Sequence, residues 1–494
     1  MNYRMIGYVL AWVLVVEGAI MSLPCAIALI YGESQGFVFL FCMVLCLALG
    51  AFGAVHKPHN TEIYSKDGMV AASLGWVVLS IFGALPFTLT GEIPHYLDAL
   101  FETISGFTTT GASILRDVEA LSHATRFWRS FSHWIGGMGV LVFILMMFPV
   151  RSGSQMNLMK AESPGYNVSK FVPRVHDTAK ILYSIYLSMT ILQIVILLLS
   201  GMYWFDALCI TFGSAGTGGF GILNDSCASY TSFQQIVISI FMIAFGVNFS
   251  FYYLISSKRI KTALKMDEVR IYLAIIIGAI VLITLNTYTL YPSVGQSIQH
   301  SLFQVASIIT TTGYSTVDFN LWPPFSKGIL LLLMCCGACA GSTGGGIKVS
   351  RIIIFFRAAR RGISSYVHPR NVQKLRMDGE PIAEDQVRSV SIFLIIYVIV
   401  FAISVFAISV DNFSFEANFA AVAATLNNIG PGLAEIGPMS NYADFSYFSK
   451  IVLMFDMLAG RLEIMPVLVM LSPGVWSGGI IKTGKRVKNK LVKA

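Results

Sequence analysis

Residues 98–113 read DALFETISGFTTTGAS, and three later segments align with them without a gap. They are DALCITFGSAGTGGFG at 206–221, HSLFQVASIITTTGYS at 300–315 and ANFAAVAATLNNIGPG at 417–432. The alignment puts Gly111, Gly219, Gly313 and Gly430 in register, 108, 94 and 117 residues apart. Such self-similarity predicts an internal fourfold repeat, and repeats outrank local motifs when a fold is assigned.

The composition places these repeats in a membrane. Of the 494 residues, 55% are hydrophobic and only 12% are charged, about half the charge of a typical soluble domain. This excludes a disordered chain, a coiled coil and a small disulfide scaffold, and it leaves too few polar side chains to cover a soluble enzyme. We therefore expect a polytopic membrane protein.

Long apolar runs predict ten membrane-spanning helices, because about 20 apolar residues cross a bilayer as a helix. The predicted spans are 5–31, 37–55, 69–89, 134–150, 181–202, 233–255, 272–290, 325–356, 390–410 and 447–471. Each repeat segment lies between two spans. The predicted fold is therefore all-α, with four pseudo-fourfold repeats of membrane helix, pore helix, filter loop and membrane helix, plus two N-terminal transmembrane helices. The predicted boundaries are 1–66 for the two N-terminal helices, 67–175, 176–265, 266–385 and 386–472 for the repeats, and 473–494 for a basic tail.

Lysine and arginine assign the two sides of the membrane. Segments before the first span, after the even-numbered spans and in the tail hold 28 of the 34 basic residues. The opposite side holds five basic residues and thirteen acids, among them Asp98 and Asp206. By the positive-inside rule the basic side is cytoplasmic, so both termini are predicted to lie there. The basic tail also suits anionic lipid headgroups.

The repeat segments have the length and composition of half-membrane pore helices. About twelve apolar residues make a helix of roughly 18 Å, which ends near the membrane centre with its negative dipole end. The Thr- and Gly-rich turn that follows is tolerated at that depth only where it lines a water- or ion-filled path. Four such turns around an axis would form a ring of carbonyl oxygens that replaces the hydration shell of a cation. The alternative is four re-entrant packing hairpins that bind no ion.

The predicted filter residues lie in the four Thr- and Gly-rich turns and are Thr109, Thr110, Gly111, Gly218, Gly219, Thr311, Thr312, Gly313, Asn428, Ile429 and Gly430. The acids at the outer ends of the pore helices, such as Asp98 and Asp206, are expected to raise the local cation concentration.

A glycine run in the eighth span predicts a gate. Residues 337–347 contain five glycines, and each costs a helix about 1 kcal/mol relative to alanine. We expect the helix to break there into a loop below the filter. The predicted gate residues are Gly341, Ser342, Thr343, Gly344, Gly345, Gly346, Lys348 and Arg461. Loop carbonyls are the expected partners of Arg461; the alternatives are an ion pair, for example with Asp456, and close helix packing by the glycines.

Several motifs together resemble one family. They are FTTTGAS, GTGGFG, TTTGYST and LNNIGPG in the repeats, WIGGMG at 134–139, AGSTGGGIK at 340–348 and GRLEIMP at 460–466. The chain resembles the TrkH-type subunits of the Trk/Ktr/HKT superfamily of potassium transporters over nearly its whole length. The resemblance implies a homodimer in which each subunit has its own pore, and a cytoplasmic ring of RCK-type, TrkA-like nucleotide-binding regulatory subunits. In this family a glycine in all four filter loops goes with potassium selectivity. The second loop departs from the Thr-Thr-Gly pattern, since it reads Thr217-Gly218-Gly219.

These expectations converge on potassium uptake across the inner membrane of a bacterium. The alternatives are a sodium- or proton-coupled potassium symporter and a membrane scaffold that only anchors a nucleotide sensor. We expect no enzyme, no tightly bound cofactor and no nucleic-acid partner; potassium is the substrate, held as a metal ion by the filter residues alone. The GxGxxG pattern at 216–221 lacks the βαβ unit that dinucleotide binding requires.

Overall fold

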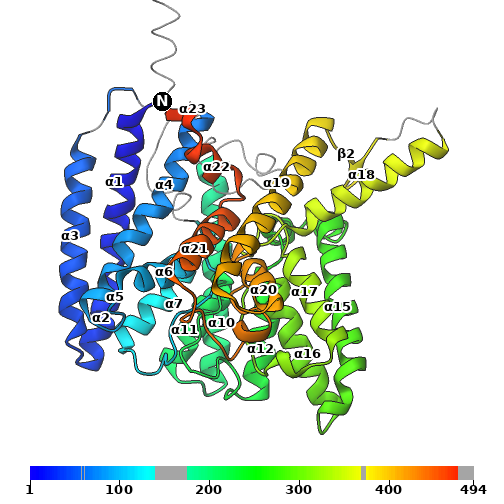
Figure 1. The fold of residues 1–494 in the computed structure, drawn as a ribbon, viewed down its shortest axis with the longest axis horizontal. Helices are drawn as coiled ribbons and strands as arrows, with labels where there is room; N and C mark the ends of the chain where they lie inside the picture. The colour runs from blue at the N-terminus through cyan, green and yellow to red at the C-terminus, as the bar shows by residue number, and fades with distance from the viewer. Residues whose placement is uncertain (57, 61, 140–174, 369–373, 477–494) are drawn as a thin grey trace, which may run out of the picture.

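The protein is described by a computed structural model covering residues 1–494 apart from 57, 61, 140–174, 369–373 and 477–494. Most of the predicted fourth span, and all but four residues of the basic tail, lie outside the described residues. The described part is an all-helical membrane protein with one short β-hairpin (Figure 1).

The helices are grouped in the order of the predicted repeats. The N-terminal unit contains α1 (Tyr3–Ile20), α2 (Ser22–Tyr31) and α3 (Gln35–Val55). The first repeat contains α4 (Ser65–Gly83), α5 (Leu85–Leu89), α6 (Tyr96–Phe107) and α7 (His123–Met138). The second contains α10 (Val175–Leu199), α11 (Trp204–Gly216), α12 (Ser232–Phe245), α13 (Phe249–Ser256) and α14 (Ile260–Ala263).

The third and fourth repeats add short connecting elements. The third contains α15 (Asp267–Thr287), η2 (Tyr288–Leu290), α16 (Val294–Ile309), η3 (Phe319–Leu321), α17 (Pro324–Cys336), α18 (Val349–Val367), β1 (Arg376–Met377) and β2 (Glu380–Pro381). The fourth contains α19 (Glu384–Ile408), η4 (Ser409–Asp411), α20 (Phe415–Leu426), η5 (Ala434–Ile436), α21 (Tyr447–Arg461), α22 (Met465–Leu471) and α23 (Pro473–Trp476).

Glycines allow the N-terminal pair of helices to pack closely. A Cβ placed on Gly50 of α3 would lie 2.8 Å from the carbonyl oxygen of Ala11, and one on Gly18 of α1 would lie 3.0 Å from that of Met43. Small residues let helix backbones approach closely in this way in a membrane, where the hydrophobic effect does not favour association of helices. In Figure 1, α1 and α3 stand beside each other at one edge of the molecule, with α4 next to α1.

Three of the four helices that follow the pore loops begin with a hydroxyl side-chain cap; α17, which follows Pro323, does not. Ser122, Thr231 and Ser446 accept hydrogen bonds from the first-turn N–H groups of α7, α12 and α21. Such caps satisfy donors that have no partner within the helix.

Fewer helices cross the membrane without a break than the ten predicted spans. In the described part of the chain, six helices are long and apolar enough to cross a membrane, or seven if a bent pair counts as one. The pair is α12 and α13, which are bent by 90°. The predicted eighth span is divided into α17 and α18 and the tenth into α21 and α22. Breaks were predicted only for the eighth.

The extra breaks have local causes. After α12, Asn248 accepts the N–H of Ser250 and starts a new helix. After α21, Glu463 and Ile464 have φ of 57° and 66°, which a right-handed helix does not allow, and Pro466 follows. The second membrane helix is therefore broken in the second, third and fourth repeats alike.

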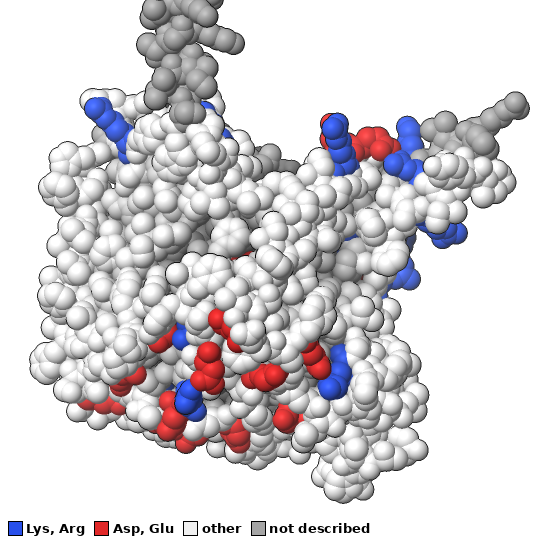
Figure 2. Space-filling model, viewed as in Figure 1, with Lys and Arg blue, Asp and Glu red and all other residues white. Residues whose placement is uncertain are grey.

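Charge is divided between the two ends of the molecule. In Figure 2 lysine and arginine gather at the end that carries the N-terminus and α18, whereas aspartate and glutamate dominate the opposite end, where a few basic residues also lie. The hydroxyl of Tyr3 donates to the carbonyl of Trp476 at 3.2 Å, so the two ends of the described chain lie together.

Candidate ion pathway

All four pore helices, α6, α11, α16 and α20, end in the same hydrogen-bonded turn. The N–H groups of Thr110, Gly218, Thr312 and Ile429 each donate at 2.8 Å to the carbonyl five residues earlier. The residues just before them, Thr109, Thr217, Thr311 and Asn428, have φ between 54° and 60°. This is a Schellman-type C-terminus. Its left-handed residue is usually glycine, but here it is threonine or asparagine, which adopt that conformation at a cost in free energy.

The four predicted filter glycines close a ring. Each has a positive φ, from 77° at Gly111 to 93° at Gly430. A Cβ on Gly111 would overlap the carbonyl oxygen of Gly218, and one on Gly219 would overlap that of Thr312.

The same relation continues around the ring. A Cβ on Gly313 would overlap the carbonyl oxygen of Ile429, and one on Gly430 would meet that of Thr110 in the first repeat. The four loops therefore follow one another in chain order around a closed circle, each glycine against the carbonyl that precedes the next glycine.

Hydroxyl and amide side chains brace the inner part of this ring. The hydroxyls of Thr108 and Thr110 are 2.8 Å apart, and those of Thr310 and Thr312 are also 2.8 Å apart. The side chain of Asn428 donates to Thr110 Oγ1 at 2.9 Å and joins the fourth repeat to the first.

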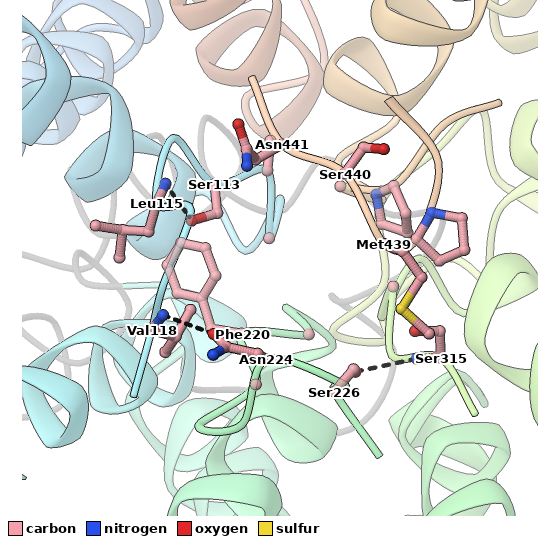
Figure 3. A pocket seen from close by; sticks show the side chains of 18 of the residues that line it. Ser113, Leu115, Val118, Phe220, Asn224, Ser226, Ser315, Met439, Ser440 and Asn441 are labelled. Carbon is pink, nitrogen blue, oxygen red and sulfur yellow. Dashed lines mark hydrogen bonds between the residues drawn. The ribbon is translucent and has the colours of Figure 1, made fainter. Parts of the chain in front are cut away.

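Outside the ring the four loops line a cavity of about 130 Å³ (Figure 3). Figure 3 shows side chains from every repeat around it, among them Ser113, Phe220, Ser315 and Asn441. The four filter glycines form part of its wall. Of the described residues that line it, two are arginines and none is an acid.

The two acids expected to attract cations, Asp98 and Asp206, differ in their partners. Asp98 lies 2.7 Å from Lys450 Nζ, which neutralises it, and Asp206 is half-buried beside the Tyr230 hydroxyl. Asp117, in the outer loop near the cavity, accepts from Asn224 Nδ2 at 2.9 Å. This hydrogen bond and those from neighbouring main-chain N–H groups hold the pKa of Asp117 below its ordinary value. The exposed charge of Asp117 is therefore retained at neutral pH.

The glycine run lies directly below the ring. The helix α17 ends at Cys336 and α18 begins at Val349, so residues 337–348 form a loop. The Gly345 N–H donates to Thr311 Oγ1 at 2.6 Å, and a Cβ on Gly345 would overlap the carbonyl oxygen of Asn427. The loop therefore contacts the inner ends of the third and fourth filter turns.

Glu268 at the start of α15 holds both ends of this loop. Its Oε1 accepts the N–H of Ala340 at 2.7 Å and that of Ser350 at 3.1 Å. Its Oε2 accepts from Asn248 Nδ2 at 3.3 Å, from the break between α12 and α13. One buried carboxylate of the third repeat thus joins this loop to the second repeat.

Arg461 lies between the loop and the first repeat. Its guanidinium donates to the carbonyl of Thr343 at 2.9 Å and to the carbonyls of Gly136 and Gly137. It is also 3.4 Å from Thr109 Oγ1. Main-chain carbonyls of the loop are therefore among its partners.

The other charges near the loop have different partners. Lys348 Nζ donates to the carbonyl of Gly344 within the loop itself. Asp456 accepts from Ser404 at 2.7 Å, and Glu463 pairs with Arg351.

Several residues of this region were missed by the sequence reasoning. They are Glu102, Arg129, His133, Glu268 and Tyr442, all of them buried. Tyr442 donates to the carbonyl of Gly430 at 2.7 Å, and Arg129 pairs with Glu102 at 2.5 Å. The rule that charges at membrane depth mark functional sites could have found the pair, but the sequence placed both in outer segments.

Comparison with known proteins shows the family of the chain. A model of the TrkH family, described as cation transport protein, matches residues 35–477. The Trk system potassium uptake proteins TrkH of Salmonella typhimurium (strain LT2) and Escherichia coli (strain K12) are each 34% identical over 488 residues, covering 96% of this chain and 100% of the relative.

A solved structure is similar as well. The crystal structure of the potassium transporter TrkH from Vibrio parahaemolyticus matches with a TM-score of 0.86 and 32% identity, covering 96% of this chain and 100% of that chain. The chain therefore belongs to the TrkH family of cation transport proteins.

Proposed function

We propose that this protein takes up potassium through a channel-like pore, with the four-loop ring as its selectivity filter and residues 337–348 as its gate. The observation that carries the proposal is the closed circle of glycine–carbonyl contacts in chain order. Carbonyl oxygens arranged in a ring can replace the hydration shell of a cation. The names of the TrkH relatives support potassium as that cation.

The gate proposal rests on three contacts below the ring. Gly345 is bound to Thr311, Arg461 is bound to the Thr343 carbonyl, and Glu268 is bound to the two ends of the loop. The loop therefore obstructs the path, and the guanidinium adds a positive charge beside it. Opening requires the loop to leave these partners, and its glycines permit the backbone change.

The setting of the pore is part of the same proposal. The protein lies in the bacterial cytoplasmic membrane with both termini cytoplasmic, which the charge division in Figure 2 supports. Each subunit of a homodimer has its own pore, and a cytosolic RCK-type nucleotide-binding subunit regulates it. The name Trk system, printed for the relatives, supports a multi-component assembly.

Ion flux in vesicles tests the proposal. The purified protein is reconstituted without any partner into vesicles with a potassium gradient and equal pH and sodium on both sides. Downhill uptake of potassium or rubidium above that of protein-free vesicles is expected. Uptake only when a sodium or proton gradient is imposed would favour a symporter instead, and no uptake under either condition would favour the scaffold. Rescue of potassium-uptake-deficient cells at low external potassium is the matching test in cells.

A further inference from the structure

A buried histidine from the first repeat lies behind the second filter loop. His133 of α7 is fully buried. Its Nε2 accepts the main-chain N–H of Phe220 at 3.1 Å, and its Nδ1 lies 2.8 Å from the carbonyl oxygen of Gly106. A carbonyl only accepts, so Nδ1 carries the proton and the ring is neutral. The imidazole thus links the end of the first pore helix to the exit of the second filter loop.

The same helix holds Phe220 from a second direction. The guanidinium carbon of Arg129 lies 3.7 Å from the centre of the Phe220 ring, and the His133 ring centre lies 4.3 Å from it. Arg129 also donates to the carbonyl of Gly221 at 2.7 Å. Because residues four apart share one helix face, α7 holds both Phe220 and Gly221.

His133 explains why the second loop departs from the Thr-Thr-Gly pattern. Gly218 occupies the position of Thr110, Thr312 and Ile429 in the other loops. Its φ is not positive, so its backbone would accept a side chain. A Cβ on Gly218, however, would overlap Cγ, Nδ1 and Cε1 of the His133 ring. The missing side chain of the filter is therefore replaced by the imidazole of a neighbouring repeat.

We infer that His133, assisted by Arg129, is a positioning residue that sets the carbonyls of the second filter loop and thereby the preference of the pore for potassium over sodium. The inference rests on the proposed function and adds a residue to it. His133 acts through Phe220 and Gly218. Its loss frees the Phe220 N–H and opens space behind the loop, so the ring of oxygens loses its fixed size.

The test compares uptake of potassium and sodium by variants in vesicles. His133→Ala is expected to retain flux but to lower the potassium-to-sodium ratio about tenfold, the change that corresponds to about 1.4 kcal/mol, or one hydrogen bond. His133→Gln can accept from Phe220 and donate to Gly106, so it is expected to restore most of the ratio. His95→Ala, at an exposed histidine, is the matched control and should leave the ratio unchanged.

A second pair of variants tests the steric argument. Gly218→Thr alone is expected to lower the ratio and the unfolding temperature, because the new side chain meets the imidazole. The double variant with Gly218→Thr and His133→Ala is expected to have a higher potassium-to-sodium ratio and a higher unfolding temperature than Gly218→Thr alone. If His133→Ala gives no monodisperse protein, His133→Phe takes its place, since it keeps a ring but makes neither hydrogen bond.

The outcomes separate this inference from the proposed function. A parent protein that prefers potassium, together with a folded His133→Ala variant of equal preference, overturns the inference alone. Equal behaviour of Gly218→Thr with and without His133 also overturns it. A parent that takes up neither ion overturns both.

Discussion

At the scale of single residues, the four turns of the proposed filter adopt a backbone conformation that threonine side chains disfavour. Thr109, Thr217 and Thr311 have left-handed φ values of 54° to 60°. A β-branched residue in that region is rare and costs of order 1–3 kcal/mol. The two Schellman hydrogen bonds of each turn, together with the neighbouring loops, hold these residues in place.

The first residue-scale prediction concerns Gly313. Its φ of 87° and its closeness to the Ile429 carbonyl leave no space for a side chain. Gly313→Ser is expected to lower potassium over sodium preference by about tenfold, because the ring of oxygens must widen. Paired flux measurements for the two ions check this. Gly328→Ser is the control, since a Cβ at Gly328 meets nothing within 4 Å. Unchanged uptake of both ions by Gly313→Ser would show that the filter lies elsewhere.

The second residue-scale prediction concerns Glu33, in the outer loop between α2 and α3. Its carboxylate accepts the N–H of His123 at 2.7 Å and that of Ala124 at 3.0 Å, at the start of α7. Burial alone would raise the pKa of Glu33, but these N–H groups and the His123 ring outweigh it and hold the pKa below its ordinary value. The carboxylate therefore stabilises the fold above its unfolded pKa, and this stability is lost as pH falls through the folded pKa.

The measurement is thermal unfolding of the detergent-solubilised protein. At about pH 7, Glu33→Gln is expected to cost about 2 kcal/mol, because it replaces charged hydrogen bonds by neutral ones. At a pH below the folded pKa the parent is protonated too, so the difference between the two proteins should shrink. Glu380→Gln, at an exposed position, should show no such difference. If the difference in stability between the parent and Glu33→Gln is the same at both pH values, the charge of Glu33 does not stabilise the start of α7.

At the scale of elements, the broken second membrane helices are the main feature. The breaks after α12, α17 and α21 meet below the four-loop ring, because Asn248 and Arg461 each contact the glycine loop and Asn248 shares Glu268 with that loop. An unbroken helix would expose no main-chain N–H or carbonyl to bind such partners. The breaks therefore supply the polar backbone groups that hold the loop.

The element-scale prediction is that weakening this assembly opens the pore. Deletion of residues 341–346, or Arg461→Ala, is expected to raise basal potassium flux. A potassium ion about 6 Å from the Arg461 guanidinium is repelled by about 3 kcal/mol at an effective dielectric near 20. This repulsion lowers the occupancy of the ion there roughly a hundredfold. Arg461→Lys keeps the charge but not the planar set of donors. Low basal flux in Arg461→Lys would indicate that electrostatic repulsion keeps the pore closed. High basal flux would indicate that the hydrogen bonds of the guanidinium do so.

The controls separate gating from damage. Arg360→Ala removes an exposed arginine of α18 and should leave basal flux unchanged. A folded loop-deletion protein whose flux does not exceed that of the parent would assign the glycine run to helix packing instead.

At the scale of the whole molecule, the basic end offers a surface for a soluble partner. Some of its charges are already used: Arg357 pairs with Asp267 at 2.9 Å and Arg361 with Glu384 at 2.5 Å. Arg361 holds the pKa of Glu384 below its ordinary value. Lys261, Lys265 and Arg360 are exposed and are the better candidates for docking.

The whole-molecule prediction is that charge reversal at Lys261, Lys265 and Arg360 weakens co-purification with an RCK-type partner several-fold, because like charges replace complementary ones. A pull-down at two salt concentrations measures this, and the parent complex should weaken with salt. Arg116→Glu on the opposite end is the control. Equal recovery of the partner by all the proteins would place the docking contacts on apolar or C-terminal residues.

The all-helical membrane class of the fold follows from local signals in the sequence. The length of an apolar run predicts a span, and glycines in register predict equivalent turns, so the all-helical membrane fold was predicted correctly. The roles of the filter and gate residues stay predictions, although the structure brings Gly111, Gly219, Gly313 and Gly430 into one ring and places the glycine loop beneath it.

Contacts between residues far apart in the chain could not be predicted and come from the folded structure. Asn428 and Thr110 are 318 positions apart and form one hydrogen bond, and Asp98 is paired with Lys450 rather than left to attract cations. Nothing in the local sequence of Gly218 shows that His133 fills the space beside it. Such contacts depend on the packing of helices from different repeats, and periodicity and composition carry no information about that packing.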